Sequence, residues 1–178
     1  MRTQDMQAVF STEKDDWGTP KLLFQKLHDE FNFCVDVCAT NENKLIADHV
    51  GPGGKIEDAI NGACWGDACN RTHAAGRYFN HTFFMNPPYS NVADFMQRMA
   101  KEATHHTDRR YVALVAARTD TKWFHEYVLP KVSEIRFIKG RVTFAGAPST
   151  APFPSMVVVY NTVISGEHWQ DASSWSYR

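Results

Sequence analysis

The chain has 178 residues with 43% hydrophobic and 13% aromatic content, which suffices for one domain with a sizeable core. No stretch is apolar for long enough to cross a membrane, and the polar, acidic start of the chain has no signal-peptide core, so we expect a cytoplasmic protein outside the membrane. The net charge is −1, but residues 1–70 have a net charge of −6 and residues 71–178 one of +5. A basic half that meets phosphates and an ordinary polarised surface explain this distribution about equally well.

Residues 1–16 lack periodicity and are expected to form a loose arm. The next residues, Trp17-Gly18-Thr19-Pro20, open a predicted amphipathic helix. Thr19 is expected to be the N-cap and Pro20 the first helical residue. The helix has apolar positions that we place on one face: Leu22, Leu23, Leu27 and Phe31. Free amides at such a helix start suit a carboxylate.

Residues 31–37 are typical of a buried strand that ends in Asp36-Val37-Cys38. An Asp at the carboxyl end of a strand faces the binding crevice of an open α/β sheet, although a cap or turn role is the alternative. Asn41 and Asn43 follow in a turn-like segment, where forming the turn is commoner than binding a ligand. Residues 66–81 are interpreted as a polar insertion whose cations either contact phosphates or remain solvated.

The spacings Cys34-x3-Cys38 and Cys64-x4-Cys69 are roughly those of a zinc site. However, Cys34 lies inside the predicted strand and Cys38 lies past its end, so the side chains of this pair are not expected to converge. Reduced thiols are the simpler interpretation for a cytosolic protein. We therefore expect no metal site.

The stretch Asn86-Pro87-Pro88-Tyr89 follows an apolar strand, and its two prolines stop that strand in a rigid turn at the carboxyl end. The Asn86 side-chain oxygen and the Pro87 carbonyl can each accept a hydrogen bond, which suits one planar amino group. Tyr89 can lie flat on the ring that carries this group. Two acceptors that pull on the hydrogens of an aromatic amine restore its lone pair, so the turn favours transition-state stabilisation over general-base catalysis.

The rest of the chain continues the alternation of helices and strands. We predict a helix and four strands, at residues 91–104, 111–117, 134–138, 141–144 and 155–160. Thr121 or Asp120 is a candidate helix cap, and Arg118 and Lys122 are cations that are candidates for phosphate contacts. Residues 161–178 form a polar tail to which we assign no role.

These motifs resemble the phage-type DNA N-6-adenine methyltransferase family. Asn-Pro-Pro-Tyr alone also occurs in glutamine and RNA methyltransferases, but the ordered set is specific. The matching segments run from Trp17 to about Tyr160: Trp17-Gly18-Thr19-Pro20, residues 33–39, residues 86–90, residues 118–124 and residues 140–144. The resemblance implies a three-layer, Rossmann-like α/β fold of class I methyltransferases, with a mostly parallel seven-stranded sheet and an antiparallel terminal hairpin. The methyltransferase domain would span residues 17–165, between the arm 1–16 and a tail 166–178.

The resemblance implies methyl transfer from S-adenosylmethionine to the N6 amino group of adenine in double-stranded DNA, after the base leaves the stack. The implied catalytic residues are Asn86, Pro87, Pro88 and Tyr89. The implied cofactor residues are Trp17, Thr19, Pro20, Asp36, Asp58 and Asn86. The implied DNA-binding residues are Arg118, Lys122 and Arg141. Two departures from the family pattern affect this set: no Gly-x-Gly follows Asp36, and the segment around Asp58 matches the family's Asp-Gly-Leu imperfectly.

Other functions remain open at this point. A methyltransferase that acts on RNA or on a protein glutamine shares the same turn, and a catalytically inactive DNA-binding module could share the same fold. The chain leaves little room for a separate recognition domain, so specificity would come from loops such as 66–81 or 145–154, or from a homodimer. The family suggests a phage protein that acts in the host cytoplasm and protects phage DNA from restriction by host nucleases.

Overall fold

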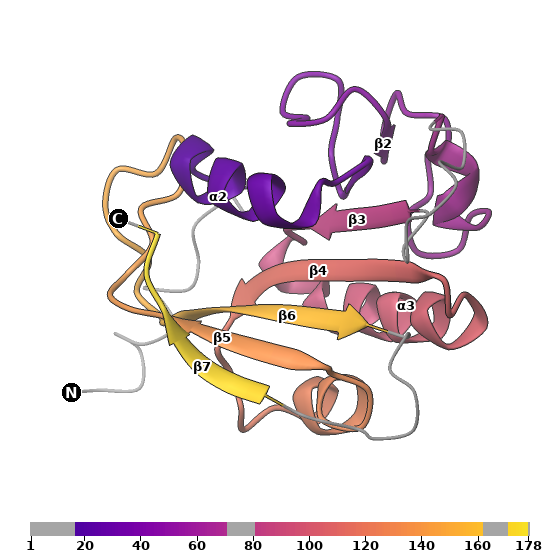
Figure 1. The fold of residues 1–178 in the computed structure, drawn as a ribbon. Coiled ribbons are helices and arrows are strands. Elements are labelled where there is room, and N and C mark those ends of the chain that lie inside the picture. The colour runs from indigo at the N-terminus through magenta and orange to yellow at the C-terminus, as the bar shows by residue number, and fades with distance from the viewer. Residues whose placement is uncertain (1–16, 71–80, 162–170, 178) are drawn as a thin grey trace.

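The computed structural model describes residues 17–70, 81–161 and 171–177, so the predicted arm 1–16 and most of the predicted insertion lie outside the described residues. The described chain forms one sheet of seven strands in the order β2-β1-β3-β4-β6-β5-β7 (Figure 1). The strands are β1 Val35–Val37, β2 His49–Val50, β3 His81–Met85, β4 Arg109–Ala116, β5 Glu134–Ile138, β6 Ser155–Asn161 and β7 Asp171–Trp175. Among these strands only β6 is antiparallel to its neighbours, β4 and β5. The predicted mostly parallel seven-stranded sheet is confirmed.

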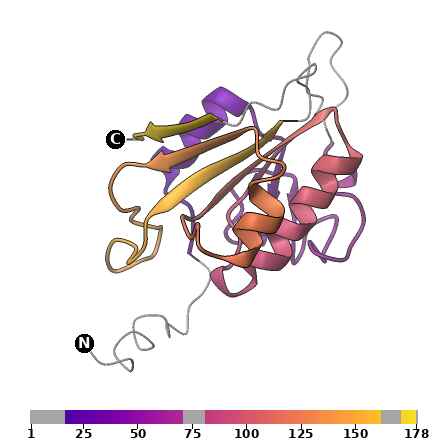
Figure 2. The same cartoon turned by 90° about the horizontal axis from the view of Figure 1, so that it is seen from below.

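Helices cover both faces of the sheet, which gives three layers. Helix α2 (Lys21–Phe31) lies on one face, and α3 (Val92–His105) and the π-helical segment η3 (Phe124–Val128) lie on the other (Figures 1 and 2). Two short 3-10 segments, η1 (Trp65–Ala68) and η2 (Tyr89–Asn91), complete the set of described helices. None of these helices is long and apolar enough to cross a membrane.

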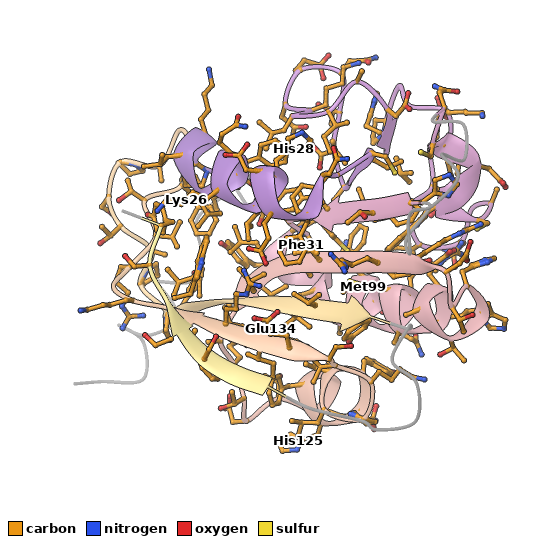
Figure 3. All side chains as sticks on the ribbon, viewed as in Figure 1. Lys26, His28, Phe31, Met99, His125 and Glu134 are labelled. Carbon is orange, nitrogen blue, oxygen red and sulfur yellow. The ribbon has the colours of Figure 1, made fainter. Side chains whose placement is uncertain are left out.

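The side chains of β4 show why the layers form. Tyr111 and Ala113 pack in the core under α3. The alternate residues Val112 and Leu114 pack in the core under α2. Successive side chains of a strand point to opposite faces, so a run that is apolar throughout is buried on both sides. Phe31 of α2 and Met99 of α3 are both buried, one in the core on each side of the sheet (Figure 3).

The start of the chain differs from the prediction in three respects. Pro20, not Thr19, is the N-cap of α2, and it makes no side-chain cap bond; its carbonyl accepts the Phe24 N–H at 2.9 Å. Leu22 is 56% exposed and does not belong to the buried face. The helix continues through Phe31 to a left-handed C-cap at Asn32 (φ 52°), so β1 has only three residues and the predicted strand 31–37 was too long.

The end of the chain differs as well. Residues 141–144 form no strand, although Val142 and Phe144 are buried as the predicted alternation requires. The strand β6 is not the last one: β7 follows and pairs in parallel with β5 from Glu134–Asp171 to Ile138–Trp175. This polar edge strand lies within the segment that the sequence suggested was a tail. By contrast, β5 has the predicted bounds, and the chain bends after it at Gly140 (φ 82°).

Candidate active site

A polar pocket lies at the carboxyl ends of β1 and β3. These strands are parallel neighbours with Asp36 opposite Phe84 and Val37 opposite Met85, so the residues that follow them leave the sheet side by side. The pocket is lined by Trp17, Gly18, Thr19, Asp36, Val37, Cys38, Ala39, Asn43, Leu45 and Asn86. The structure thus brings together four of the residues that were predicted to bind a cofactor: Trp17, Thr19, Asp36 and Asn86.

Asn86 occupies this pocket in a defined orientation. Strand β3 is buried along its whole length and ends at Met85, and the Asn86 side chain then donates from Nδ2 to the backbone carbonyl of Trp17 at 2.8 Å. This bond turns the donor end of the amide toward Trp17, and Oδ1 is therefore the end that can accept a hydrogen bond from another group. The contact joins residues 69 positions apart, so no local pattern in the sequence indicates it.

The two prolines shape the rest of the turn. Pro87 is buried, and Pro88 has an extended ψ of 136° before the short 3-10 segment η2 begins at Tyr89. The Tyr89 ring makes edge-type contacts with Phe144 (centroids 6.0 Å apart, planes at 80°) and with Phe153 (4.8 Å, 72°). Perpendicular aromatic contacts of this kind are favourable, and here they constrain the plane of the Tyr89 ring.

Asp36 is the carboxylic acid among the residues that line the pocket. It is only 5% exposed, and its Oδ2 accepts the Leu45 N–H at 2.8 Å. Burial raises the pKa of Asp36 from 3.8 to about 7, and the Leu45 hydrogen bond acts in the opposite direction. A cation bound beside this carboxylate would favour its ionised form, so the site is suited to a positively charged ligand group.

The segment 17–19 connects the pocket to the loop at Ala145. Gly18 and Ala145 form an isolated antiparallel bridge, in which the Ala145 N–H donates to the Gly18 carbonyl at 2.7 Å. A Cβ on Gly18 would lie 3.2 Å from the Cβ of Ala145, so a larger residue at position 18 would require a small shift of Ala145. Trp17 through its carbonyl and Gly18 through this bridge therefore hold the turn that begins at Asn86 and the loop after Phe144 together.

The sequence matches the DNA N-6-adenine-methyltransferase (Dam) family over residues 7–169. The chain belongs to this family. A protein named DNA N-6-adenine-methyltransferase from Haemophilus phage HP1 (strain HP1c1) is 29% identical over 135 residues, which cover 75% of this chain and 68% of the phage protein. The predicted activity, methylation of adenine N6 in DNA, and the predicted fold are both confirmed at this level.

In this Dam-family methyltransferase the turn after β1 is made without glycine. Cys38 adopts a left-handed conformation (φ 70°), and its N–H and that of Ala39 both donate to the Val50 carbonyl, at 3.0 and 3.2 Å. A non-glycine residue in this conformation costs about 1–2 kcal/mol, and such strain is often found at functional sites. The missing Gly-x-Gly is thus a difference in residue type, while the backbone still makes a sharp turn beside the pocket.

Asn43 shows that the turn role and the pocket role are compatible. Its Oδ1 accepts the Thr40 N–H at 2.7 Å, which is a turn-forming bond, and the residue also lines the pocket of this Dam-family enzyme. Asn41 instead contacts Gly53 and Lys44 at the surface and is not among the lining residues. Sequence reasoning could not distinguish these two asparagines, and it missed Cys38 and Leu45 as lining residues.

Two predicted cofactor residues lie outside the pocket lining. Pro20 caps α2 immediately after Thr19. Asp58 is exposed, and its Oδ1 accepts the N–H groups of Ile60 and Asn61, both at 2.9 Å, as a turn-forming Asp does. The predicted contact of Asp58 with the cofactor has no support from this placement and stays a prediction.

The three predicted DNA-binding residues are exposed. Arg118 follows the carboxyl end of β4, and Arg141 follows that of β5. Lys122 forms an ion pair with Glu126 at 3.5 Å, one helical turn further on. The predicted cap role of Thr121 is wrong: its hydroxyl donates to the Arg118 carbonyl at 2.7 Å, and the N-cap of η3 is Trp123, with no side-chain cap bond.

Proposed function

We propose that this phage-encoded enzyme binds S-adenosylmethionine in the pocket between β1 and β3 and methylates adenine N6 in double-stranded DNA through Asn86-Pro87-Pro88-Tyr89. The observation that carries the proposal is the bond from Asn86 Nδ2 to the Trp17 carbonyl. It gives the amide the orientation in which Oδ1 can accept a hydrogen bond from the target amino group.

The residues of the pocket fit the cofactor's charged groups. S-adenosylmethionine carries an amino group, a carboxylate and a sulfonium centre, and when bound it supplies an electrophilic methyl group. The Asp36 carboxylate suits the amino group, because a cation there offsets the cost of burying the charged acid. The first amides of α2, next to Thr19, suit the carboxylate.

The catalytic turn acts on the amine rather than on the cofactor. Asn86 Oδ1 and the Pro87 carbonyl each accept a hydrogen bond from one N–H of the amine. These two bonds draw the nitrogen lone pair out of conjugation with the purine ring. Tyr89 stacks on the base, and its ring plane is constrained by Phe144 and Phe153. Neither acceptor titrates near neutral pH, so the proton that the amine loses passes to solvent.

The DNA would approach the carboxyl edge of the sheet. Strands β3, β4 and β5 all run in one direction, so Asn86, Arg118 and Arg141 follow strand ends on the same edge. Arginines there would contact phosphates, and the target base would swing out of the duplex to reach the turn. Lys122 would contribute less, since it is already paired with Glu126.

The proposal is tested by methyl transfer from labelled S-adenosylmethionine to unmethylated duplex DNA, followed by nucleoside analysis. The label is expected in N6-methyladenine. Asn86→Ala should lower kcat by about 10²–10³, the usual cost of losing one transition-state hydrogen bond. Its cofactor affinity, measured by calorimetry, should change little.

Asn91→Ala is the matched control, because Asn91 is exposed and makes no side-chain cap bond. This variant should keep wild-type kcat. Full activity of Asn86→Ala would refute the catalytic assignment. Label in RNA or in protein but not in DNA would refute the substrate assignment.

A further inference from the structure

A second group of reactive side chains lies near the amino ends of the strands, on the side of the sheet away from the pocket. Cys64 precedes η1, while Glu102 and His106 lie one turn apart at the end of α3. Cys64 Sγ is 3.4 Å from Glu102 Oε2 and 3.2 Å from His106 Nε2, and these last two atoms are 3.8 Å apart. Arg109, the first residue of β4, donates to Cys64 Sγ at 2.8 Å, which places the cluster at the amino end of that strand.

These distances match those between the ligands of a tetrahedral zinc ion. Zinc binds sulfur at about 2.3 Å and nitrogen or carboxylate oxygen at about 2.0–2.2 Å, so tetrahedral angles separate its ligand atoms by roughly 3.3–3.6 Å. The three separations of 3.2, 3.4 and 3.8 Å lie around this range. An ion would therefore fit with small side-chain adjustments.

Arg98 orients two of the three ligands. It donates to Glu102 Oε1 from Nε at 3.1 Å and from a terminal nitrogen at 2.6 Å, which leaves Oε2 on the side of Cys64. The same guanidinium donates to three carbonyls just before Cys64: Ile60 at 2.9 Å, Gly62 at 3.1 Å and Ala63 at 2.8 Å. Such outer hydrogen bonds commonly hold the ligands of metal sites in place.

The charges and ligand types select the metal. A metal-bound Cys64 thiolate and the Glu102 carboxylate would contribute two negative charges, but the guanidinium groups of Arg98 and Arg109 lie within hydrogen-bond distance of these two ligands and offset them. A hard cation such as Mg²⁺ or Ca²⁺ gains little there, because it depends on charge and on oxygen ligands. A borderline-soft ion that bonds to sulfur and imidazole gains more, which favours Zn²⁺.

We propose that Cys64 Sγ, Glu102 Oε2 and His106 Nε2 bind one Zn²⁺ ion. Cys64 releases its thiol proton to solvent, His106 binds as the neutral imidazole, and a water completes the tetrahedron on the side where His106 is 31% exposed. The ion would tie the loop before η1 to α3. This inference replaces the sequence-based expectation of no metal site, which considered only pairs of cysteines.

The first test is a titration of metal-free enzyme with Co²⁺, followed by displacement with Zn²⁺. The wild type is expected to bind one equivalent with a thiolate-to-cobalt charge-transfer band, and Zn²⁺ should raise its Tm. Cys64→Ser should lose the band and the Tm shift, whereas Cys69→Ser should keep both, because Cys69 is a partly buried cysteine outside the cluster. Stoichiometric binding without the charge-transfer band, or with the band unchanged in Cys64→Ser, overturns the proposal.

A second pair of variants tests the proposal even if the cysteine variant fails to fold. His106→Ala should weaken Zn²⁺ binding more than tenfold, whereas His105→Ala should leave it unchanged, because His105 is exposed and its Nδ1 contacts the Lys101 carbonyl. Equal affinities in the two histidine variants, or failure of the wild type to bind one equivalent, overturn the proposal. Neither readout depends on methyl transfer, so this outcome and that of the proposed function are independent.

Discussion

At the scale of single residues, Asp36 is expected to make the cofactor affinity of the pocket depend on pH. Its pKa is raised to about 7 by burial, so in the ligand-free enzyme the carboxyl is partly protonated at neutral pH. A bound amino group requires the ionised form. We therefore expect cofactor affinity to rise between pH 6 and pH 8 and then to level off.

Asp36→Asn should weaken cofactor binding and remove this pH dependence, because the amide cannot ionise but can still accept the Leu45 N–H. Calorimetric titrations from pH 6 to pH 9 measure both effects. A variant that keeps the wild-type pH dependence would show that another group titrates.

The same substitution has a predictable effect on stability without ligand. The folded-state pKa of Asp36 lies above its ordinary value, so its favourable contribution is present below pH 3.8 and is lost as the pH rises through about 7. The difference between 3.8 and about 7 corresponds to at most about 4 kcal/mol. Asp36→Asn should therefore raise the free energy of unfolding at pH 9 and leave it unchanged near pH 4. Urea unfolding at both pH values tests this, and an equal gain at both would contradict it.

At the scale of elements, β7 is the strand with the least sequence signal. It adds a polar edge to β5, and the residues after it return to the core: Tyr177 is 6% exposed and stacks near Trp175 with ring centroids 6.4 Å apart. The Lys139 N–H donates to the Trp175 carbonyl at 2.9 Å. The last described residues therefore belong to the packed fold rather than to a solvated tail.

Tyr177→Ala should lower the free energy of unfolding by about 3 kcal/mol, because it removes a large buried ring from the core under α2. The neighbouring Ser176→Ala changes an exposed residue and should stay within about 0.5 kcal/mol of the wild type. Urea unfolding compares the two variants. Equal stabilities would mean that the end of the chain contributes little to the fold.

At the scale of the whole molecule, strand direction separates two surfaces. The pocket, Arg118 and Arg141 follow the carboxyl ends of parallel strands, and the cluster of Cys64, Glu102 and His106 lies by the amino end of β4. DNA would thus bind at the carboxyl ends of the parallel strands, and the metal ion would bind near their amino ends. We expect zinc to change the stability of the enzyme more than its DNA affinity.

Arg118→Ala and Arg141→Ala should each raise the KM for DNA and lower the salt dependence of DNA binding by about one charge, because each would remove one of the proposed phosphate contacts. Cofactor affinity should be unchanged. Lys101→Ala is the control, since Lys101 is exposed on α3 in the last turn and a half before His106. Binding measured at several salt concentrations tests this, and an unchanged slope in both arginine variants would place the DNA elsewhere.

The sequence by itself determined the features that depend on neighbouring residues. Two prolines after an apolar run end β3 at the turn that begins with Asn86, and apolar spacing predicted α3 and β5 to within a residue or two. The ordered motifs were enough to indicate the family, because each one is a short contiguous segment.

Only the tertiary structure decided the features that depend on contacts between distant segments. The Trp17 carbonyl that orients Asn86 is 69 residues away, and Cys64 is 38 residues from Glu102. The pKa of Asp36 follows from burial, and β7 follows from the free edge of β5, although most of its own residues are polar. Local periodicity records which face of an element is apolar, but it holds no information on which remote group that element meets, because packing of the whole chain sets those contacts.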